Sequence, residues 1–352
     1  MRALALLLSL SLPVLAQSLV VPSEVARVEV LRRALPAVVR IEGVFQDPLQ
    51  GNEGPVYGTG FFVSPTHIVT NYHVVLDVRH LRVVLYDHRT FPAQVTWIDK
   101  GIDIAVLTVE GVRAPAILQF APAQNLPIGM SLLVVGSPEG GPILALSGIL
   151  SGIAPLSATF QDTRPRGVGD EIADYLYTDA PVAQGNSGSP VLDLEGQVVG
   201  VIDSIVGGPG GLGGGIGLAI PGPLVHQSVV DLERYGAPQR GWLGASLISL
   251  DQLDPLLLAK LGLYSSQGAM INKIVPGGPA ALAGLRAAQR TPDGKLVAMG
   301  DVILAVGGHP VANAEQVIQL IAQYRPGDRV PLIIWRSGRR IEVIVTMIAR
   351  RG

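Results

Sequence analysis

The chain of 352 residues contains no cysteine. Disulfide bonds, cysteine nucleophiles and cysteine-based metal sites are therefore excluded, and the folded chain depends on its hydrophobic cores and on assembly for stability. A strong net charge is also missing, because 26 basic residues nearly balance 28 acidic ones and leave a formal net charge of −2. This balance gives no reason to expect nucleic acid or an anionic membrane surface as a partner.

Aromatic residues are scarce, at 5% of the chain, whereas glycine and proline are abundant, with 43 and 27 residues. Hydrophobic residues make up 48% and charged residues 15%, which is typical of globular domains with substantial cores. Many glycines and prolines between short apolar runs favour a loop-rich β architecture over a helical bundle. A length of 352 residues accommodates two domains of about 100 to 200 residues each.

Long hydrophobic runs are absent beyond the first residues of the chain. An apolar run follows Arg2 and ends in Val14-Leu15-Ala16, and it is shorter than the about 20 residues that a transmembrane helix needs. We expect residues 1–16 to be a signal peptide that is cleaved after Ala16, with an uncleaved anchor as the alternative. The mature chain is then expected in the periplasm or on the extracellular face of a bacterial cytoplasmic membrane.

One stretch of small residues, Gly185-Asn186-Ser187-Gly188-Ser189-Pro190, lies between two runs that predict strands. Small residues beside Ser187 allow a sharp turn that projects the hydroxyl. The same turn can bring the amides of Gly185, Asn186 and Ser187 together as an oxyanion hole. By itself such a stretch is most often only a turn, so the catalytic interpretation depends on partners elsewhere.

Two such partners precede the serine. His73 follows the apolar run 67–70, where an imidazole can act as a general base at a barrel rim. Asp103 opens the apolar run 104–107, where its carboxylate can orient the imidazole and stabilise the imidazolium. The order His73, Asp103, Ser187 is that of the double-barrel serine proteases.

Other candidate residues fit structural roles better. His67 lies near His73 in the sequence, but no third ligand accompanies them, so we expect no metal site. No motif calls for a cofactor either. Asp179 is a possible substitute for Asp103, although its place before the serine fits a structural hydrogen bond better. Asp203 is expected to cap a loop.

These blocks resemble the HtrA (Deg) family of serine proteases. Thr178-Asp179-Ala180 and the run 215–221 carry the same resemblance, which extends over roughly residues 24–348. The chain departs from the family pattern at Ser189, where glycine is usual, at Ile102, where threonine is usual, and at Ala183-Gln184. None of these departures removes a catalytic side chain.

The resemblance implies an all-β double-barrel (chymotrypsin-like) protease domain followed by an α+β PDZ domain. The implied domains are residues 17–236 for the protease, 237–240 for the linker and 241–349 for the PDZ domain. It also implies a substrate pocket lined by Val182, Val206 and Ile220. Because none of the three is acidic, cleavage is expected after small or medium aliphatic residues.

A PDZ domain captures C-terminal peptides by adding them as a strand at a sheet edge. Gly241-Trp242-Leu243-Gly244-Ala245 resembles its carboxylate-binding loop, in which the amides of Leu243 and Gly244 would bind the terminal carboxylate, and Trp242 is either a contact residue or simple packing. The helix expected over 313–323 would form the other side of the groove. Its groove-facing residues would be Val317 and Leu320 or Ile321.

The polar segment 155–176 is either a solvated loop or, as the resemblance implies, a loop that senses ligand binding through Arg164 or Arg166. The segment 45–57 is expected to be a polar loop whose Phe45 and Tyr57 are either ordinary loop anchors or, as the resemblance implies, contacts of a homotrimer interface. The implied function is an exported, ATP-independent endopeptidase that degrades unfolded or damaged proteins and is gated by PDZ peptide binding. A chaperone or adaptor with a resting or inactive protease fold is the alternative.

Overall fold

The computed structural model describes most of the chain. The described ranges are 22–46, 51–122, 126–156, 168–206, 215–254, 258–259, 266–291 and 296–349. The expected signal peptide, residues 1–16, lies outside them. Within these ranges, no helix is both long and apolar enough to cross a membrane.

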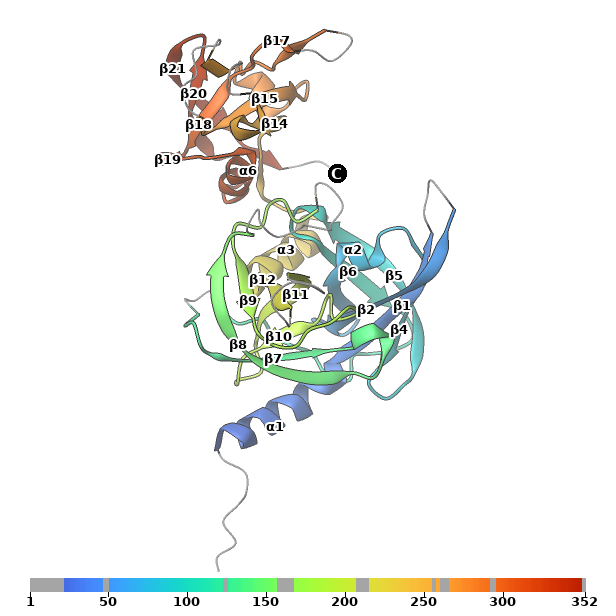
Figure 1. Ribbon diagram of the computed structural model, residues 1–352. Helices are drawn as coiled ribbons and strands as arrows, with labels where there is room; N and C mark the ends of the chain where they lie inside the picture. Colours follow the sequence, from blue (N-terminus) through green and yellow to red (C-terminus); the bar gives the residue numbers. More distant parts are fainter. Residues whose placement is uncertain are drawn as a thin grey trace, which may run out of the picture.

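The first closed barrel has the strand order β1-β2-β3-β6-β5-β4. Helix α1 (Pro22–Ala34) precedes it, and α2 (Tyr72–Val75) follows β3 (Figure 1). Buried side chains from all six strands form one cluster that fills the barrel, as in small antiparallel barrels. The strands are β1 (Val38–Gln46), β2 (Glu53–Phe62), β3 (His67–Asn71), β4 (Val78–Leu85), β5 (Thr90–Asp99) and β6 (Ile104–Val109).

The predicted loop over 45–57 is too long at both ends. Strand β1 continues to Gln46 and β2 starts at Glu53, with Phe45 opposite Gly54 in the ladder. Local glycine and proline suggested a turn, but pairing along the full length of β1 overrides that composition. Pro55 fits the strand because the described pairing of β2 with β3 involves Phe61 and Phe62, which leaves the other edge of β2 open at Pro55.

The second closed barrel has the strand order β10-β11-β12-β9-β8-β7. Helix α3 (Gly222–Tyr235) follows β12 and packs on β11 and β12, so that it closes this part of the chain. The strands are β7 (Ser131–Gly136), β8 (Leu144–Ala154), β9 (Tyr175–Thr178), β10 (Pro190–Leu192), β11 (Val198–Val206) and β12 (Ile216–Pro221).

One hydrophobic core joins the two barrels. Phe61, Val69 and Ile104 of the first barrel belong to the same buried cluster as Val135 and Ile220 of the second. Burial of large apolar side chains at this seam contributes about 1.5–3 kcal/mol for each side chain. The seam therefore holds the ends of β3, β6 and β10 in a fixed relation.

After Gly241 the chain forms a sheet in the order β14-β15-β18-β20-β21 with helix α6 (Ala314–Ala322), as expected of a PDZ domain. Asn313 caps α6 by accepting a hydrogen bond from the amide of Gln316, which explains why the helix starts there. The strands are β13 (Gly241–Trp242), β14 (Ala245–Ser249), β15 (Ala269–Ile274), β16 (Gln289–Arg290), β17 (Leu296–Ala298), β18 (Val302–Val306), β19 (His309–Pro310), β20 (Arg329–Arg336), β21 (Arg339–Thr346) and β22 (Ile348–Ala349), with α5 at Pro279–Leu282.

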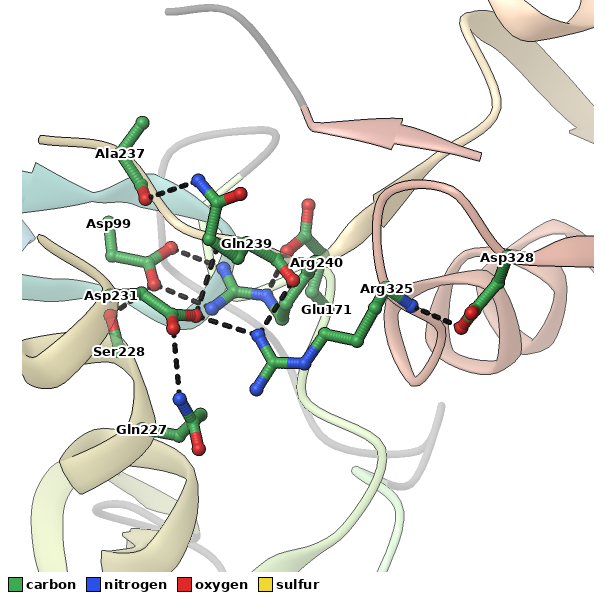
Figure 2. Close-up of polar contacts among 10 residues, drawn as sticks. All are labelled: Asp99, Glu171, Gln227, Ser228, Asp231, Ala237, Gln239, Arg240, Arg325 and Asp328. Carbon is green, nitrogen blue, oxygen red and sulfur yellow. Dashed lines mark hydrogen bonds and ion pairs between the residues drawn. The ribbon is translucent and has the colours of Figure 1, made fainter. Parts of the chain in front are cut away.

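Helix α6 lies on the side of this region that faces the barrels (Figure 1). Gln319 of α6 donates a hydrogen bond of 3.0 Å to the carbonyl of Ile172. Arg325 forms an ion pair of 2.9 Å with Asp231 of α3 and donates to the carbonyl of Gln239 at 2.7 Å (Figure 2). The PDZ sheet is therefore tied to the second barrel and α3 through α6 and the turn that follows it.

Candidate active site

His73 and Asp103 meet at the rim of the first barrel. His73 lies in the short helix α2 directly after β3, and Asp103 lies between the 3-10 helix Lys100–Ile102 and β6. The carboxylate of Asp103 accepts the backbone amide of His73 at 2.9 Å and contacts Nδ1 of its ring at 2.5 Å. Since Nδ1 is engaged, Nε2 is the ring nitrogen left to act as a base.

The backbone around Asp103 fixes this arrangement. Asp103 is fully buried and adopts a left-handed conformation with φ of 55°. Its carbonyl accepts hydrogen bonds from the amide of Tyr72 and from the side chain of Asn71, both at 3.0 Å. Burial raises the pKa of Tyr72, and the carboxylates of Asp77 and Asp103 raise it further, so the phenol stays neutral.

Ser187 lies in the predicted tight turn before β10. The amide of Thr59 donates to the carbonyl of Ser187 at 2.9 Å, which attaches the turn to the first barrel. Gly188 has φ of +86°, and a Cβ there would lie 2.0 Å from the carbonyl oxygen of Thr59. Only glycine fits this close approach. The two barrels therefore meet directly behind the nucleophile.

Gly185 is also required by the local geometry. Its φ is +90°, and a Cβ would lie 2.6 Å from both the amide nitrogen of Glu139 and the carbonyl oxygen of Ser137. The amide of Asn186 donates to the carbonyl of Ala183 within the turn. Gly185 and Ser187 are thus the better placed of the three predicted oxyanion donors.

The substitution at Ser189 fits without strain. The backbone of Ser189 is not left-handed. Its hydroxyl oxygen lies beside Gly136, where a Cβ on that glycine would be only 2.0 Å away. Ser189 is fully buried against this glycine. The departure from glycine at this position therefore leaves the turn intact.

A cleft of about 540 Å³ is lined by both His73 and Ser187, whereas Asp103 is buried behind His73. Tyr57 of β2 forms part of its wall and packs against Gly140. An extended peptide backbone placed in this cleft would lie beside both Ser187 and His73. The lining residues are Pro55, Val56, Tyr57, His73, Val74, Glu139, Gln184, Gly185 and Ser187.

Asp203 is a member of the site that sequence reasoning missed. It lies inside β11 and caps no loop. The hydroxyl of Ser187 donates a hydrogen bond of 3.1 Å to its carbonyl. Its carboxylate lies near His73 and Asp103, with one atom of each residue within 4.8 Å of the others. An acidic residue in the middle of an otherwise apolar strand was the available signal.

The three predicted pocket residues do not gather. Val206 and Ile220 belong to the core at the barrel seam, whereas Val182 belongs to a separate cluster that includes Ile205. Ile205 lies opposite Gly217 in the ladder, and a Cβ at Gly217 would lie 2.9 Å from Val182. Val182, Ile205 and Gly217 thus lie side by side, which only cross-strand register reveals.

The PDZ groove lies between α6 and β14. Val317 and Ile321 line it as expected, but Ile318 takes the place of Leu320, which packs on the PDZ core. Trp242, Leu243 and Ala245 line the other side, and Gly244 turns the loop with φ of +71°. Its volume is about 190 Å³, and it is bounded on the protease side by Gly101, Asp170 and Glu171.

The segment that bounds the groove is joined to the turn before Asp103. The amides of Gly169 and Glu171 donate to the carbonyls of Lys100 and Gly101, in the turn that leads to Asp103. The segment thus runs from the groove to the base of the triad. Arg164 and Arg166, predicted to act in this region, lie outside the described residues.

Arg240, directly before β13, connects this segment to the end of β5 through two ion pairs. Its guanidinium pairs with Asp99 and, at 2.6 Å, with Glu171 (Figure 2). Burial by itself lowers the pKa of Arg240, but the two carboxylates outweigh burial and raise the pKa above its usual value. The guanidinium is therefore a permanent positive charge between two acidic residues of the protease region.

Together, the two barrels, the His-Asp pair beside a serine turn and the appended sheet define a trypsin-like peptidase fold with a PDZ domain. A trypsin-like peptidase domain family matches residues 58–201, and a PDZ domain family matches residues 241–347. The chain belongs to the HtrA (Deg) family of serine proteases.

Individual relatives agree with this assignment. A probable periplasmic serine endoprotease DegP-like from Chlamydia pneumoniae is 34% identical over 293 residues, which cover 83% of this chain and 55% of that protein. Protease Do-like 1, chloroplastic, from Arabidopsis thaliana is 30% identical over 333 residues, covering 92% and 72%. The chain thus spans about half the length of the bacterial curated relatives that it matches.

Solved structures share the fold. The HtrA-type protease AlgW with decapeptide has a TM-score of 0.68 and 25% identity, over 92% of this chain and 99% of that one. The serine endoprotease from Yersinia pestis has a TM-score of 0.60 and 26% identity, over 92% and 97%. Each match covers 92% of this chain and therefore extends over both the barrels and the PDZ region.

Proposed function

We propose that the chain is an ATP-independent serine endopeptidase of protein quality control, with Ser187, His73 and Asp103 as its catalytic triad. The observation that carries this proposal is the double contact of the Asp103 carboxylate with the amide and the ring of His73, in a cleft shared with Ser187. This geometry orients the imidazole for proton transfer.

In the proposed reaction, Ser187 attacks the scissile carbonyl while Nε2 of His73 takes the hydroxyl proton. The amides of Gly185 and Ser187 bind the oxyanion, His73 then protonates the leaving amine, and a water molecule completes hydrolysis by the reverse roles. Asp103 keeps the ring in position and stabilises the imidazolium. No cofactor takes part in these steps.

The substrates we propose are unfolded or damaged polypeptides, cleaved after small or medium aliphatic residues. The apolar wall of Val182, Ile205 and Gly217 supports this preference, because it carries no charge to pair with a basic side chain. An open cleft on the barrel surface accepts an extended chain, which a folded protein does not present.

We further propose that C-terminal peptides bind the groove between β14 and α6 and regulate the protease. The names of the relatives support an exported location, since several are called periplasmic. A division into residues 17–236, 237–240 and 241–349 and a homotrimer complete the proposal. Tyr57 lines the cleft and is partly exposed, and Phe45 is exposed on β1, where a neighbouring subunit could cover it.

The test is hydrolysis of casein by wild type and by Ser187→Ala, with and without a peptide that ends in an aliphatic residue and a free carboxylate. We expect cleavage that is lost in the variant and raised by the peptide. Absence of cleavage under both conditions, with a folded protein, would contradict the proposal. Suppression of aggregation by Ser187→Ala at the wild-type level would then favour the chaperone or adaptor function.

A further inference from the structure

Asp203 occupies a β-bulge in strand β11. In the ladder with β12, Ile202 lies opposite Ala219 and Ser204 lies opposite Leu218, so the register shifts at Asp203. A bulge re-aims the side chain of its extra residue and is common beside active sites. Asp203 is 1% exposed, so the bulge directs a carboxylate into the protein interior.

Both ends of this residue face the catalytic centre. The main-chain carbonyl of Asp203 accepts the hydrogen bond from Oγ of Ser187 at 3.1 Å. A carboxylate oxygen of Asp203 lies within 4.8 Å of a ring nitrogen of His73 and of a carboxylate oxygen of Asp103. The imidazole therefore has a buried acid near it from each barrel.

The effect of this arrangement depends on the charges of Asp103, Asp203 and the His73 ring. With a neutral imidazole, Asp103 and Asp203 would place two negative charges in a buried site, and like charges at short range oppose each other. A proton on His73 relieves this repulsion. The imidazolium formed when Ser187 gives up its proton is then stabilised by two carboxylates.

The other titratable groups around His73 have weaker effects. Tyr72 is adjacent in the chain and stays neutral. Asp77, at the end of the turn after α2, and Glu139, across the cleft, are both exposed, so water screens their charges. Asp103 and Asp203 are the buried acids described at this centre.

We propose that Asp203 is a second acidic positioning residue for His73, which stabilises the imidazolium and sets the lower pH limit of activity. This inference rests on the proposed protease function. The carboxylate favours the protonated ring at rest, so the general base becomes available only at higher pH than in a site with Asp103 alone. Activity is thereby confined to neutral and alkaline pH.

The experiment is the pH profile of kcat/KM for wild type, Asp203→Asn and Asp193→Asn. Asp203→Asn keeps the shape of the side chain and removes its charge. We expect its acid limb to move to lower pH by about one unit. Asp193, a buried acid in the turn before β11, accepts amides there, so Asp193→Asn should leave the limb in place.

A second readout does not depend on catalysis. The titration of the His73 ring is followed by NMR in the Ser187→Ala background, with and without Asp203→Asn, and its midpoint should fall by a similar amount. If Asp203→Asn does not fold, Asp203→Thr removes the same charge with a side chain that suits a strand. An unchanged midpoint or an unchanged acid limb in a folded variant overturns the proposal.

The two readouts also separate this proposal from the proposed function. If Asp203→Asn shifts the midpoint of the His73 titration but wild type cleaves nothing at any pH, the role of Asp203 is supported and the protease function is rejected. If wild type cleaves and the acid limb of Asp203→Asn is unshifted, the protease function is supported and the role of Asp203 is rejected.

Discussion

Arg240, directly before β13, is paired with Asp99, the residue that ends β5 and leads into the turn before Asp103. The pair is deeply buried, since the side chain of Arg240 is 10% exposed and that of Asp99 is 1% exposed. Ser228 of α3 also donates to the Asp99 carboxylate. The linker between the two domains is therefore built into the support of the triad.

We expect Arg240→Ala to lower the free energy of unfolding by about 3 to 5 kcal/mol, because it leaves two buried carboxylates without their cation. Catalytic turnover should fall with it, since Asp103 follows the destabilised turn. Chemical denaturation and peptide hydrolysis measure the two effects. The matched control is Arg32→Ala, which breaks an exposed ion pair within α1 and should change neither quantity. Equal stability of the two variants would contradict a structural role for the linker pair.

Gly188→Ala should abolish hydrolysis and destabilise the protein by about 3 kcal/mol or more, because the methyl group would collide with the Thr59 carbonyl. Gly308→Ala is the matched control, since its φ of +87° is nearly the same but no atom lies within 4 Å. Its cost should be only about 1 kcal/mol, from backbone strain. Thermal unfolding of both variants separates strain from collision, and similar losses would show that no collision occurs.

Asp103→Asn should reduce kcat by about 10⁴-fold, because an amide no longer holds the ring of His73 in the tautomer that can accept a proton. The fold should persist, since the amide oxygen can still accept the His73 amide. Turnover of a peptide ester is the measurement, with Asp87→Asn, an exposed surface acid, as control. A small loss in Asp103→Asn would assign the orienting role to another carboxylate, and Asp203 is the structural candidate.

Gly217→Val should narrow the substrate pocket, because its side chain would enter the space beside Val182. We expect kcat/KM for peptides with leucine before the scissile bond to fall at least tenfold, with a smaller loss for alanine. Val206→Ala is the informative comparison, since Val206 belongs to the seam core and should alter stability more than specificity. If only Val206→Ala lost the preference for leucine, the result would support the pocket of Val182, Val206 and Ile220 that the sequence predicts.

Contact between the PDZ region and the second barrel leads to a prediction on regulation. Gln319→Ala removes the hydrogen bond to Ile172, next to the segment that supports the turn before Asp103. We expect the activating effect of a C-terminal peptide to change while peptide affinity changes by about fivefold or less, because Gln319 does not line the groove and a single hydrogen bond contributes about 1 kcal/mol. Gln323→Ala, at the exposed C-cap of the same helix, serves as control. An unchanged response to the peptide in Gln319→Ala would separate this contact from regulation.

The sequence by itself determined the two barrels and the PDZ region. It also predicted His73, Asp103 and Ser187 as a triad, and the structure places His73 against Asp103 and in one cleft with Ser187. These features depend on local patterns: short apolar strands between turn residues, glycines where a turn needs positive φ, and a His-Asp-Ser order spread over three blocks. The helix over 314–322 lies close to the bounds 313–323 that the sequence predicts.

Only the tertiary structure decided which side chains line the same pocket wall and which charged groups lie together. Ile205 replaces Ile220 beside Val182 because of strand register, and Ile318 replaces Leu320 in the groove because of the rotation of α6. The strand through Phe45 depends on cross-strand pairing that its glycine-rich composition conceals. Asp203 and Arg240 act between barrels and between domains, and a contact between distant segments leaves no periodic trace in the sequence.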